Sequence, residues 1–299
     1  MSYSRTATRK RARPLLGTFV EVAMTADDAA AAAAADRRLD DCITEAFAAI
    51  AEVEGRMSRY RAGSELARLN GAAVGEWIDV HPSLVEVLET ADRLFHESGG
   101  VFDVRCGAWL DGGMGLEEAR PEIAAGQPPV EISGSRVRRT SPHTLDLGGI
   151  AKGYAVDRAV EAVLQRAGSL PTAGIVNAGG DLRVWGAEEQ PVGIRIEGGE
   201  GALLVPIRVR EAAVATSAPR LPAGEERAPR SAGHVRMAEG RLCQDAMTVT
   251  AIADRCLFAD ALTKIVMMAS GDVARRCLSS YGAQALVFDS AAGLQRVLP

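Results

Sequence analysis

An acid, a pair of glycines and a lysine lie together in the stretch from Asp146 to Asp157, where an extended segment passes into a helix. Gly148 and Gly149 let the backbone approach a ligand closely, and the first turn of the helix presents unpaired N–H groups. Lys152 adds a positive charge within that turn. The stretch therefore predicts a site for an anion, such as a ligand that carries phosphate.

Both charged residues of this stretch also have ordinary structural roles. A carboxylate at the mouth of a helix, as at Asp146, can bind N–H or hydroxyl groups of a ligand, or it can cap the turn. Lys152 can bind a phosphate as a point charge, or it can lie on a solvated face of the helix. The residue types alone leave these alternatives open.

Two later segments carry residues of the same kind. A second glycine junction runs from Gly174 to Asp181, and an acid, Asp260, lies in a strongly apolar helix. An acid in such a helix must be paired, cap a turn or coordinate a cation, because burying a lone carboxylate is costly. Of these roles we favour a ligand-binding one for Asp260, such as coordination of a cation.

Length and composition exclude two broad classes of function. The chain has 299 residues, 47% of them hydrophobic, and a formal net charge of -5 at pH 7, so a large core is expected and general binding of nucleic acid is not. No run approaches the roughly 18 apolar residues that a membrane-spanning helix needs. The segment from Pro14 to Val22 is typical of a strand and not of a signal peptide, so we expect a cytoplasmic protein.

The commonest catalytic and metal-binding patterns are absent from the sequence. The five cysteines include no C-x-x-C pair, which favours reduced core thiols over a zinc site. No G-x-G-x-x-G or Walker motif supports a Rossmann or P-loop fold. The histidines share no spacing typical of a metal site or a catalytic triad; they are His81, His96, His143 and His234.

The periodicity of apolar residues predicts helices separated by short strands. Because the strands do not alternate with helices in a regular βαβ rhythm, the pattern indicates an α+β fold. The basic residues before Pro14 predict a solvated N-terminal arm over residues 1–13. The expected helices cover residues 27–57, 64–70, 83–98, 151–167, 256–269 and 273–281.

Taken in order along the chain, a set of short stretches resembles the ApbE family, the FAD:protein FMN transferases. The matching stretches are Leu16–Glu21, Met57–Tyr60, Ser64–Leu66, Phe102–Asp103, Asp146–Tyr154, Val176–Asp181, Ala215–Ser217, Gly233–His234, Thr248–Val249 and Ala259–Leu262. The resemblance implies a tunnelling-fold-like α+β class with antiparallel sheets flanked by helices. It also implies one domain over residues 14–299 whose two lobes hold FAD in the cleft between them.

The resemblance implies an activity and a set of site residues. Such enzymes use Mg2+, with Mn2+ as an alternative, to move FMN from FAD to a threonine or serine of an acceptor protein, releasing AMP. The implied FAD contacts are Met57, Val101, Phe102, Asp103, Asp146, Lys152 and Val235. The implied cation ligands are Gly149, Asp260 and Thr263, and the implied catalytic residues are Asp260, Lys152 and His234.

Two positions depart from the family pattern. After His234 the family continues with two apolar residues and Asp-Pro, whereas this chain has Met237 and Ala238 at the last two places. Lys264 stands where the family has threonine, four residues after Asp260. A lysine there can weaken the cation site or partly stand in for it, whereas Thr263 can supply an oxygen after a small local shift. Two alternatives therefore remain: an FAD-binding or regulatory protein that has lost transfer, and an FAD pyrophosphatase that yields FMN and AMP.

Overall fold

The centre of the computed structural model is an eight-stranded antiparallel sheet. The structure describes residues 6–27, 32–107, 127–167, 171–198, 201–218, 247–289 and 293–298. The strands lie in the order β1 (Thr6–Leu15), β2 (Thr18–Asp27), β6 (Ala173–Ala178), β7 (Asp181–Gly186), β10 (Ala213–Ser217), β11 (Met247–Ala253), β12 (Gln284–Asp289) and β13 (Gly293–Leu298). Pairing of strands far apart in sequence, such as β2 and β6, places the second glycine junction, Gly174 to Asp181, in this sheet.

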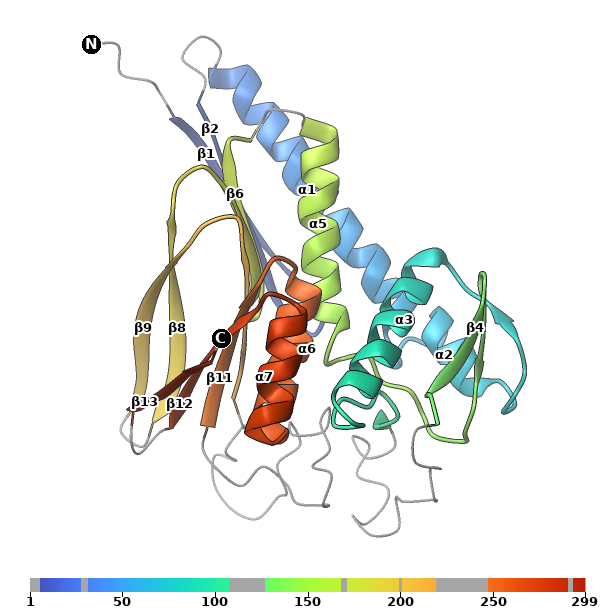
Figure 1. Cartoon of the computed structure of the whole chain (residues 1–299). Helices are drawn as coiled ribbons and strands as arrows, with labels where there is room; N and C mark the ends of the chain where they lie inside the picture. Colours follow the sequence, from blue (N-terminus) through green and yellow to red (C-terminus); the bar gives the residue numbers. More distant parts are fainter. Residues whose placement is uncertain are drawn as a thin grey trace.

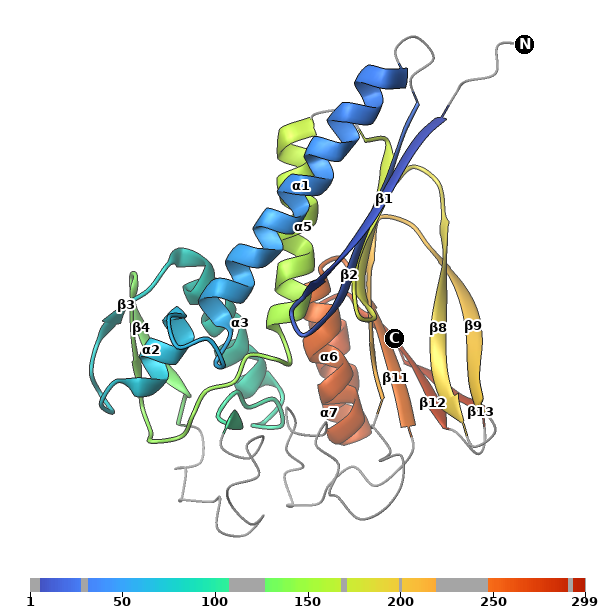
Figure 2. The same ribbon diagram turned by 180° about the vertical axis from the view of Figure 1, so that it is seen from behind.

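Helices cover one face of this sheet, and a two-stranded hairpin lies against the other (Figures 1 and 2). The covering helices are α1 (Ala32–Met57), α5 (Ala151–Ala167), α6 (Cys256–Met268) and α7 (Gly271–Ser280), and the hairpin is β8 (Gln190–Gly198) with β9 (Gly201–Val209). Side chains of β7 alternate between the two faces, as the period of a strand requires. Leu182 and Val184 pack under the hairpin, whereas Asp181 and Arg183 reach α5.

A smaller group of elements lies beside the lower ends of α1 and α5 in Figure 1. It contains α2 (Glu65–Gly71), α3 (Pro82–Glu97) and a three-stranded sheet of β3 (Ile78–Asp79), β5 (Arg136–Arg139) and β4 (Val130–Ser133). Ser64 caps α2 by accepting a hydrogen bond from the Ala67 N–H at 2.9 Å. The expected helices at these positions, and those of α5, α6 and α7, are confirmed to within a few residues at their ends.

The N-terminal residues differ from the expectation of a solvated arm, because residues 6–13 belong to β1. Leu16 and Gly17 take left-handed backbone angles, with φ of 55° and 69°, and so reverse the chain into β2. Arg9 pairs with Asp36 at 2.6 Å, and Arg11 pairs with Asp40 at 2.9 Å. The basic side chains are therefore balanced by acids of α1, so this edge strand can pack without a large excess of positive charge.

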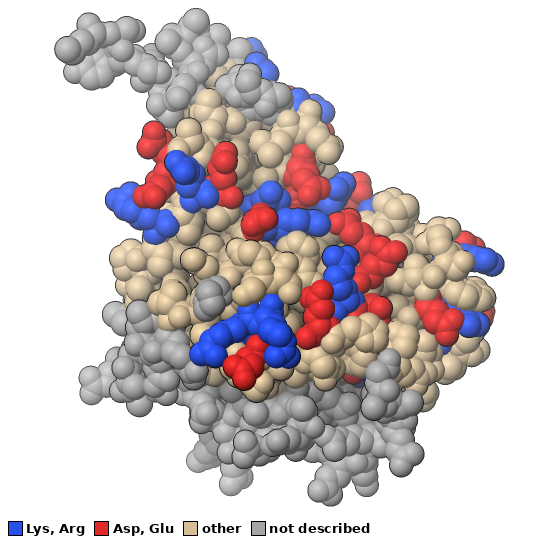
Figure 3. Space-filling view, viewed as in Figure 1, with Lys and Arg blue, Asp and Glu red and all other residues tan. Residues whose placement is uncertain are grey.

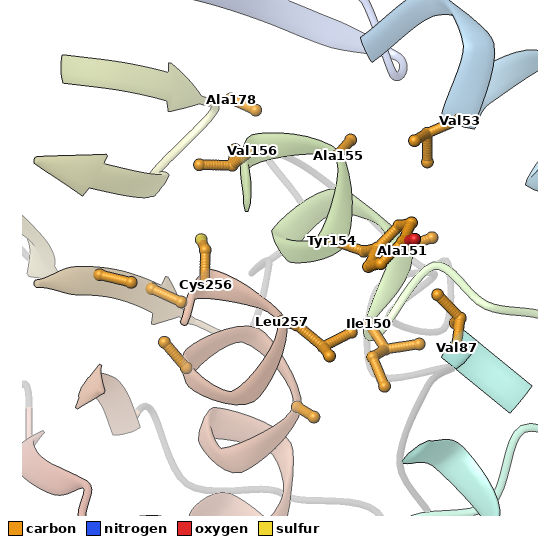
Figure 4. Packing of buried hydrophobic residues seen from close by; sticks show 14 of the residues in the cluster. Val53, Val87, Ile150, Ala151, Tyr154, Ala155, Val156, Ala178, Cys256 and Leu257 are labelled. Carbon is orange, nitrogen blue, oxygen red and sulfur yellow. The ribbon is translucent and has the colours of Figure 1, made fainter. Parts of the chain in front are cut away.

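Contacts between α5 and α6 determine where the start of α6 lies. Asp157 of α5 is fully buried and accepts hydrogen bonds from the N–H groups of Cys256 and Leu257, both at 2.9 Å. These bonds satisfy two donors that the first turn of a helix leaves unpaired. Figure 4 shows the Cys256 side chain pointing toward Val156 of α5 and the Leu257 side chain pointing toward Ile150, just before α5. The carboxylate of one helix thus caps the next.

The buried hydroxyl of Tyr154 predicts that the protein loses stability at alkaline pH. Its ring is buried and its hydroxyl donates to Glu86 at 2.8 Å; burial, together with Glu86, raises the pKa of Tyr154 above its usual value near 10. The unfolded chain therefore releases this proton first as pH rises, which favours unfolding. Between pH 9 and 11 the free energy of unfolding should fall by about 1 kcal/mol more in the wild type than in Tyr154→Phe, measured by urea denaturation. Equal falls in the two proteins would contradict the prediction.

The face shown in Figure 3 carries positive and negative side chains next to one another. Arg255 pairs with Glu86 at 2.9 Å and Arg158 pairs with Glu161 at 2.6 Å. Neither sign of charge therefore dominates this face. No helix within the described ranges combines the length and the apolar character that crossing a bilayer requires.

Candidate functional site

The turn before α5 is built around Asp146. One carboxylate oxygen, Oδ1, accepts the N–H of Gly148 at 2.7 Å, and the other forms an ion pair with the Arg59 guanidinium. The α5 helix then begins with the N–H of Ala151 bonded to the carbonyl of Leu147 at 2.7 Å. Asp146 is buried and does cap its turn, so its structural role is observed. Its predicted contact with FAD stays a prediction.

Lys152 extends from the first turn of α5 to the start of β7. Its Nζ donates to the Asp181 carboxylate, which is buried, while the lysine side chain itself is 33% exposed. The turn between β6 and β7 places Asp181: Gly179 and Gly180 have φ of 68° and 104°, which favours glycine at both positions. The two glycine junctions of the sequence thus meet through one ion pair.

Asp260 lies on the second turn of α6 with no exposed surface. Its Oδ1 accepts from the Lys264 ammonium, and its Oδ2 accepts the N–H of Gly153 at 3.1 Å. Lys264 Nζ also donates to the Asp260 backbone carbonyl at 2.9 Å. The hydroxyl of Thr263 donates to that carbonyl at 2.7 Å and lies 2.8 Å from the Ser217 hydroxyl. Of the roles predicted for Asp260, pairing is the one seen.

Burial and neighbouring charges shift the pKa values of Asp260, Asp181 and Lys152. Burial raises the pKa of Asp260, but the charges of Lys264 and Lys152 outweigh that effect and leave it below the usual value. Burial raises the pKa of Asp181, the Asp260 charge adds to the increase, and the two lysines only partly oppose it. Burial disfavours the charged form of Lys152, yet Asp181 and Asp260 hold its pKa above its ordinary value. Lys152, Asp181, Asp260 and Lys264 therefore form one cluster of interacting charges, which we call the lysine–aspartate cluster.

Asp103, another predicted contact of FAD, is paired on both oxygens. Arg105 Nε donates to Oδ1 and Nη2 to Oδ2, each at 2.9 Å, and both side chains are buried. The N–H of Asp146 donates to the carbonyl of Val104 at 2.8 Å, which joins this segment to the turn before α5. The structure thus brings together two segments predicted to contact FAD, the one with Asp103 and the one with Asp146.

The apolar residues predicted to contact FAD are buried. Met57 ends α1 at 4% exposure, and Phe102 is 2% exposed with its N–H bonded to the Ser98 hydroxyl. Val101 packs against Met268 at the end of α6. Gly149 is buried in the turn before α5. Two predicted residues, His234 and Val235, lie outside the described residues, so their roles stay predictions.

Several partners of the site residues were not predicted from the sequence. They are Arg59, Arg105, Asp181 and Ser217. Arg59, Asp181 and Ser217 stand inside the stretches that carry the family resemblance, which is the one signal that could have found them. Their pairings join residues far apart in the chain, which no local pattern reports.

The family model described as the ApbE family matches residues 16–287. The chain belongs to the ApbE family. Solved structures agree with this at the level of the fold. Flavin transferase ApbE from Vibrio cholerae has a TM-score of 0.77 at 22% identity, covering 98% of this chain and 97% of that one. The apo form of the Pseudomonas stutzeri flavinyl transferase ApbE has a TM-score of 0.78 at 19% identity, covering 100% and 95%. The predicted α+β class is confirmed.

Two curated relatives, both named FAD:protein FMN transferase, match part of the chain. The Rhodobacter capsulatus protein is 35% identical over 140 residues, which is 42% of this chain and 26% of that protein. The Vibrio cholerae protein is 32% identical over 167 residues, which is 51% of this chain and 49% of that protein. The matches thus span about a quarter and about half of the relatives' length.

Proposed function

We propose that this ApbE-family chain transfers FMN from FAD to a threonine or serine of an acceptor protein and releases AMP. The observation that carries the proposal is Lys152, which follows a glycine pair in the first turn of α5 and keeps a third of its side chain exposed. A lysine in that position can reach a phosphate of a bound dinucleotide. The names of the two curated relatives support the same activity.

The proposed reaction is a phosphoryl-type transfer. The acceptor hydroxyl attacks the phosphorus on the FMN side of the pyrophosphate, the bond to the AMP oxygen breaks, and the hydroxyl proton leaves to a base. Positioning and neutralisation of charge dominate such catalysis. Lys152 would neutralise phosphate charge, while Asp146, Asp103 and the apolar residues Met57, Val101 and Phe102 would shape the FAD site. His234 and Val235 remain proposed members of it.

The Mg2+ ion that the family resemblance implies would be held by Gly149, Asp260 and Thr263. The described side chains do not fit that ion as they stand. Lys264 occupies one carboxylate oxygen of Asp260, and Gly153 donates to the other. Among the described residues no three or more His, Cys, Asp or Glu side chains gather in a way that could hold a metal. None of the residue roles proposed above depends on the ion.

The proposal is tested by coexpressing the chain with a flavinylatable acceptor domain and weighing the acceptor by intact-mass spectrometry. A mass gain equal to FMN is expected, and Lys152→Met should lower its rate about 100-fold, because one fixed charge on the reacting group is lost. The matched control is Lys10→Met, which removes an exposed lysine of β1 and should leave the rate unchanged. An unmodified acceptor, with an active family member modifying it in parallel, would overturn the proposal.

The Lys264–Asp260 pair favours one alternative, an FAD-binding protein without transfer activity. FAD that copurifies with the chain and is not consumed, with the acceptor unmodified, would favour it. Release of AMP and free FMN without an acceptor would instead indicate a pyrophosphatase. The cytoplasmic location and the single domain of two lobes stay predictions.

A further inference from the structure

Lys264 places a positive charge where the family resemblance implies a metal ion. Its Nζ contacts a carboxylate oxygen and the backbone carbonyl oxygen of the same residue, Asp260, one helical turn earlier. Carboxylate and carbonyl oxygens are also the protein ligands that Mg2+ prefers. The ammonium therefore occupies the kind of oxygen environment that a hard cation would occupy.

The remaining oxygens beside Asp260 are already engaged. Asp260 Oδ2 accepts from Gly153, and the Thr263 hydroxyl bonds both the Asp260 carbonyl and Ser217. A divalent cation would have to share these oxygens with their present hydrogen-bond donors. It would also have to approach the Lys264 charge closely, in a buried place where like charges repel strongly.

The local charge is balanced without a metal ion. The lysine–aspartate cluster contains two ammonium groups, Lys152 and Lys264, and two carboxylates, Asp181 and Asp260. Lysine is rare in this chain, which has it elsewhere only at Lys10 and uses arginine for its other cations. Arginine is planar and long, whereas a lysine ammonium is a compact point charge. Lysine is thus the side chain that can imitate a bound ion.

We propose, on the basis of the proposed function, that the ammonium group of Lys264 takes the place of a divalent cation beside Asp260. The chain then binds the diphosphate of FAD without a metal ion. Lys152, which is a third exposed and reaches Asp181, supplies the other positive charge of the cluster. Loss of the Lys264 charge, with an oxygen ligand supplied in its place, should restore a need for the ion.

The first experiment titrates the full chain with Mn2+ alone and follows the free ion by electron paramagnetic resonance. Lys264→Thr should bind Mn2+ about tenfold or more tightly than the wild type, and adding Asp260→Asn should abolish the gain. Lys264→Met, which removes the charge without supplying an oxygen, should bind Mn2+ less tightly than Lys264→Thr. The matched control is Lys10→Thr, which should behave as the wild type. Circular dichroism establishes that each variant is folded.

Two results of this titration would overturn the inference. One is a wild-type chain that takes up Mn2+ stoichiometrically and loses it on Asp260→Asn, a comparison that does not depend on any Lys264 variant folding. The other is a folded Lys264→Thr chain that binds Mn2+ no better than the wild type, because the place beside Asp260 would then not be a cation position.

A second experiment measures FAD affinity by fluorescence anisotropy in EDTA and in Mg2+. The wild type should bind FAD equally in both, whereas Lys264→Thr should bind about tenfold more tightly in Mg2+. A similar dependence on Mg2+ in the wild type would overturn the inference. If FAD does not bind under any condition, the proposed function fails, and the Mn2+ titration still decides the role of Lys264.

Discussion

Replacement of Asp260 by Asn should lower the free energy of unfolding by about 3 kcal/mol, because it leaves the Lys264 ammonium buried without a carboxylate. Asn keeps the size of the side chain and can still accept the N–H of Gly153, so the loss reports the charge. Urea denaturation at pH 7 measures it. The double variant Asp260→Asn, Lys264→Met removes both buried charges and should recover most of the lost stability.

The control for this prediction is an ion pair with the same spacing on a helix surface. Glu52 and Arg56 of α1 are also four residues apart, 3.1 Å from each other, but the Glu52 side chain is 64% exposed. Glu52→Gln should change the free energy of unfolding by only about 0.5 kcal/mol, because water screens an exposed pair. If Asp260→Asn costs no more than Glu52→Gln, the cluster is not the buried network that the structure describes.

Replacement of Gly153 by Ala should destabilise the protein by about 3 kcal/mol and disturb the Asp260 site. A Cβ at this position would lie 2.2 Å from the carbonyl oxygen of Cys256 and 2.9 Å from the Cβ of Asp260. The oxygen is backbone, so no change of rotamer relieves the clash, and α5 must move away from α6. The hydrogen bond from Gly153 to Asp260 and the caps from Asp157 to α6 would both lengthen. Thermal and urea denaturation measure the cost.

The matched control is Gly55→Ala, a change of the same residue type inside α1. A Cβ there has no atom within 4 Å, and its φ is not in the left-handed region. Alanine should therefore stabilise the helix by about 0.5 to 1 kcal/mol. Equal effects of the two substitutions would mean that the close approach of α5 to α6 does not matter for stability.

Local sequence patterns predicted the helices well, because residues close together in the chain determine the apolar face of a helix and its caps. Ser64 at the start of α2 and Pro82 at the start of α3 are examples. The charge pattern predicts a solvated N-terminal arm, whereas residues 6–13 lie in β1. Arg9 and Arg11 become acceptable in a strand only when α1 brings Asp36 and Asp40 against them.

The glycine junctions and the acid in an apolar helix were recognisable as candidate sites, but their partners were not. Asp146 could bind a ligand or cap a turn, and the structure shows the cap together with the Arg59 pair. Lys152 could lie on a solvated face, and it instead reaches Asp181, twenty-nine positions along the chain. Which partner each of these side chains finds depends on how the strands and helices pack against one another.

The sequence by itself determined the family, the α+β class and the segments that carry polar residues beside glycine, because these depend on residue type and near-neighbour spacing. Only the tertiary structure decided which charges meet. The order β2, β6, β7 in the sheet sets Asp181 beside Lys152, and the packing of α5 on α6 sets Gly153 against Asp260. Buried charges must find partners to offset their desolvation, and the partners come from segments whose proximity is created by folding.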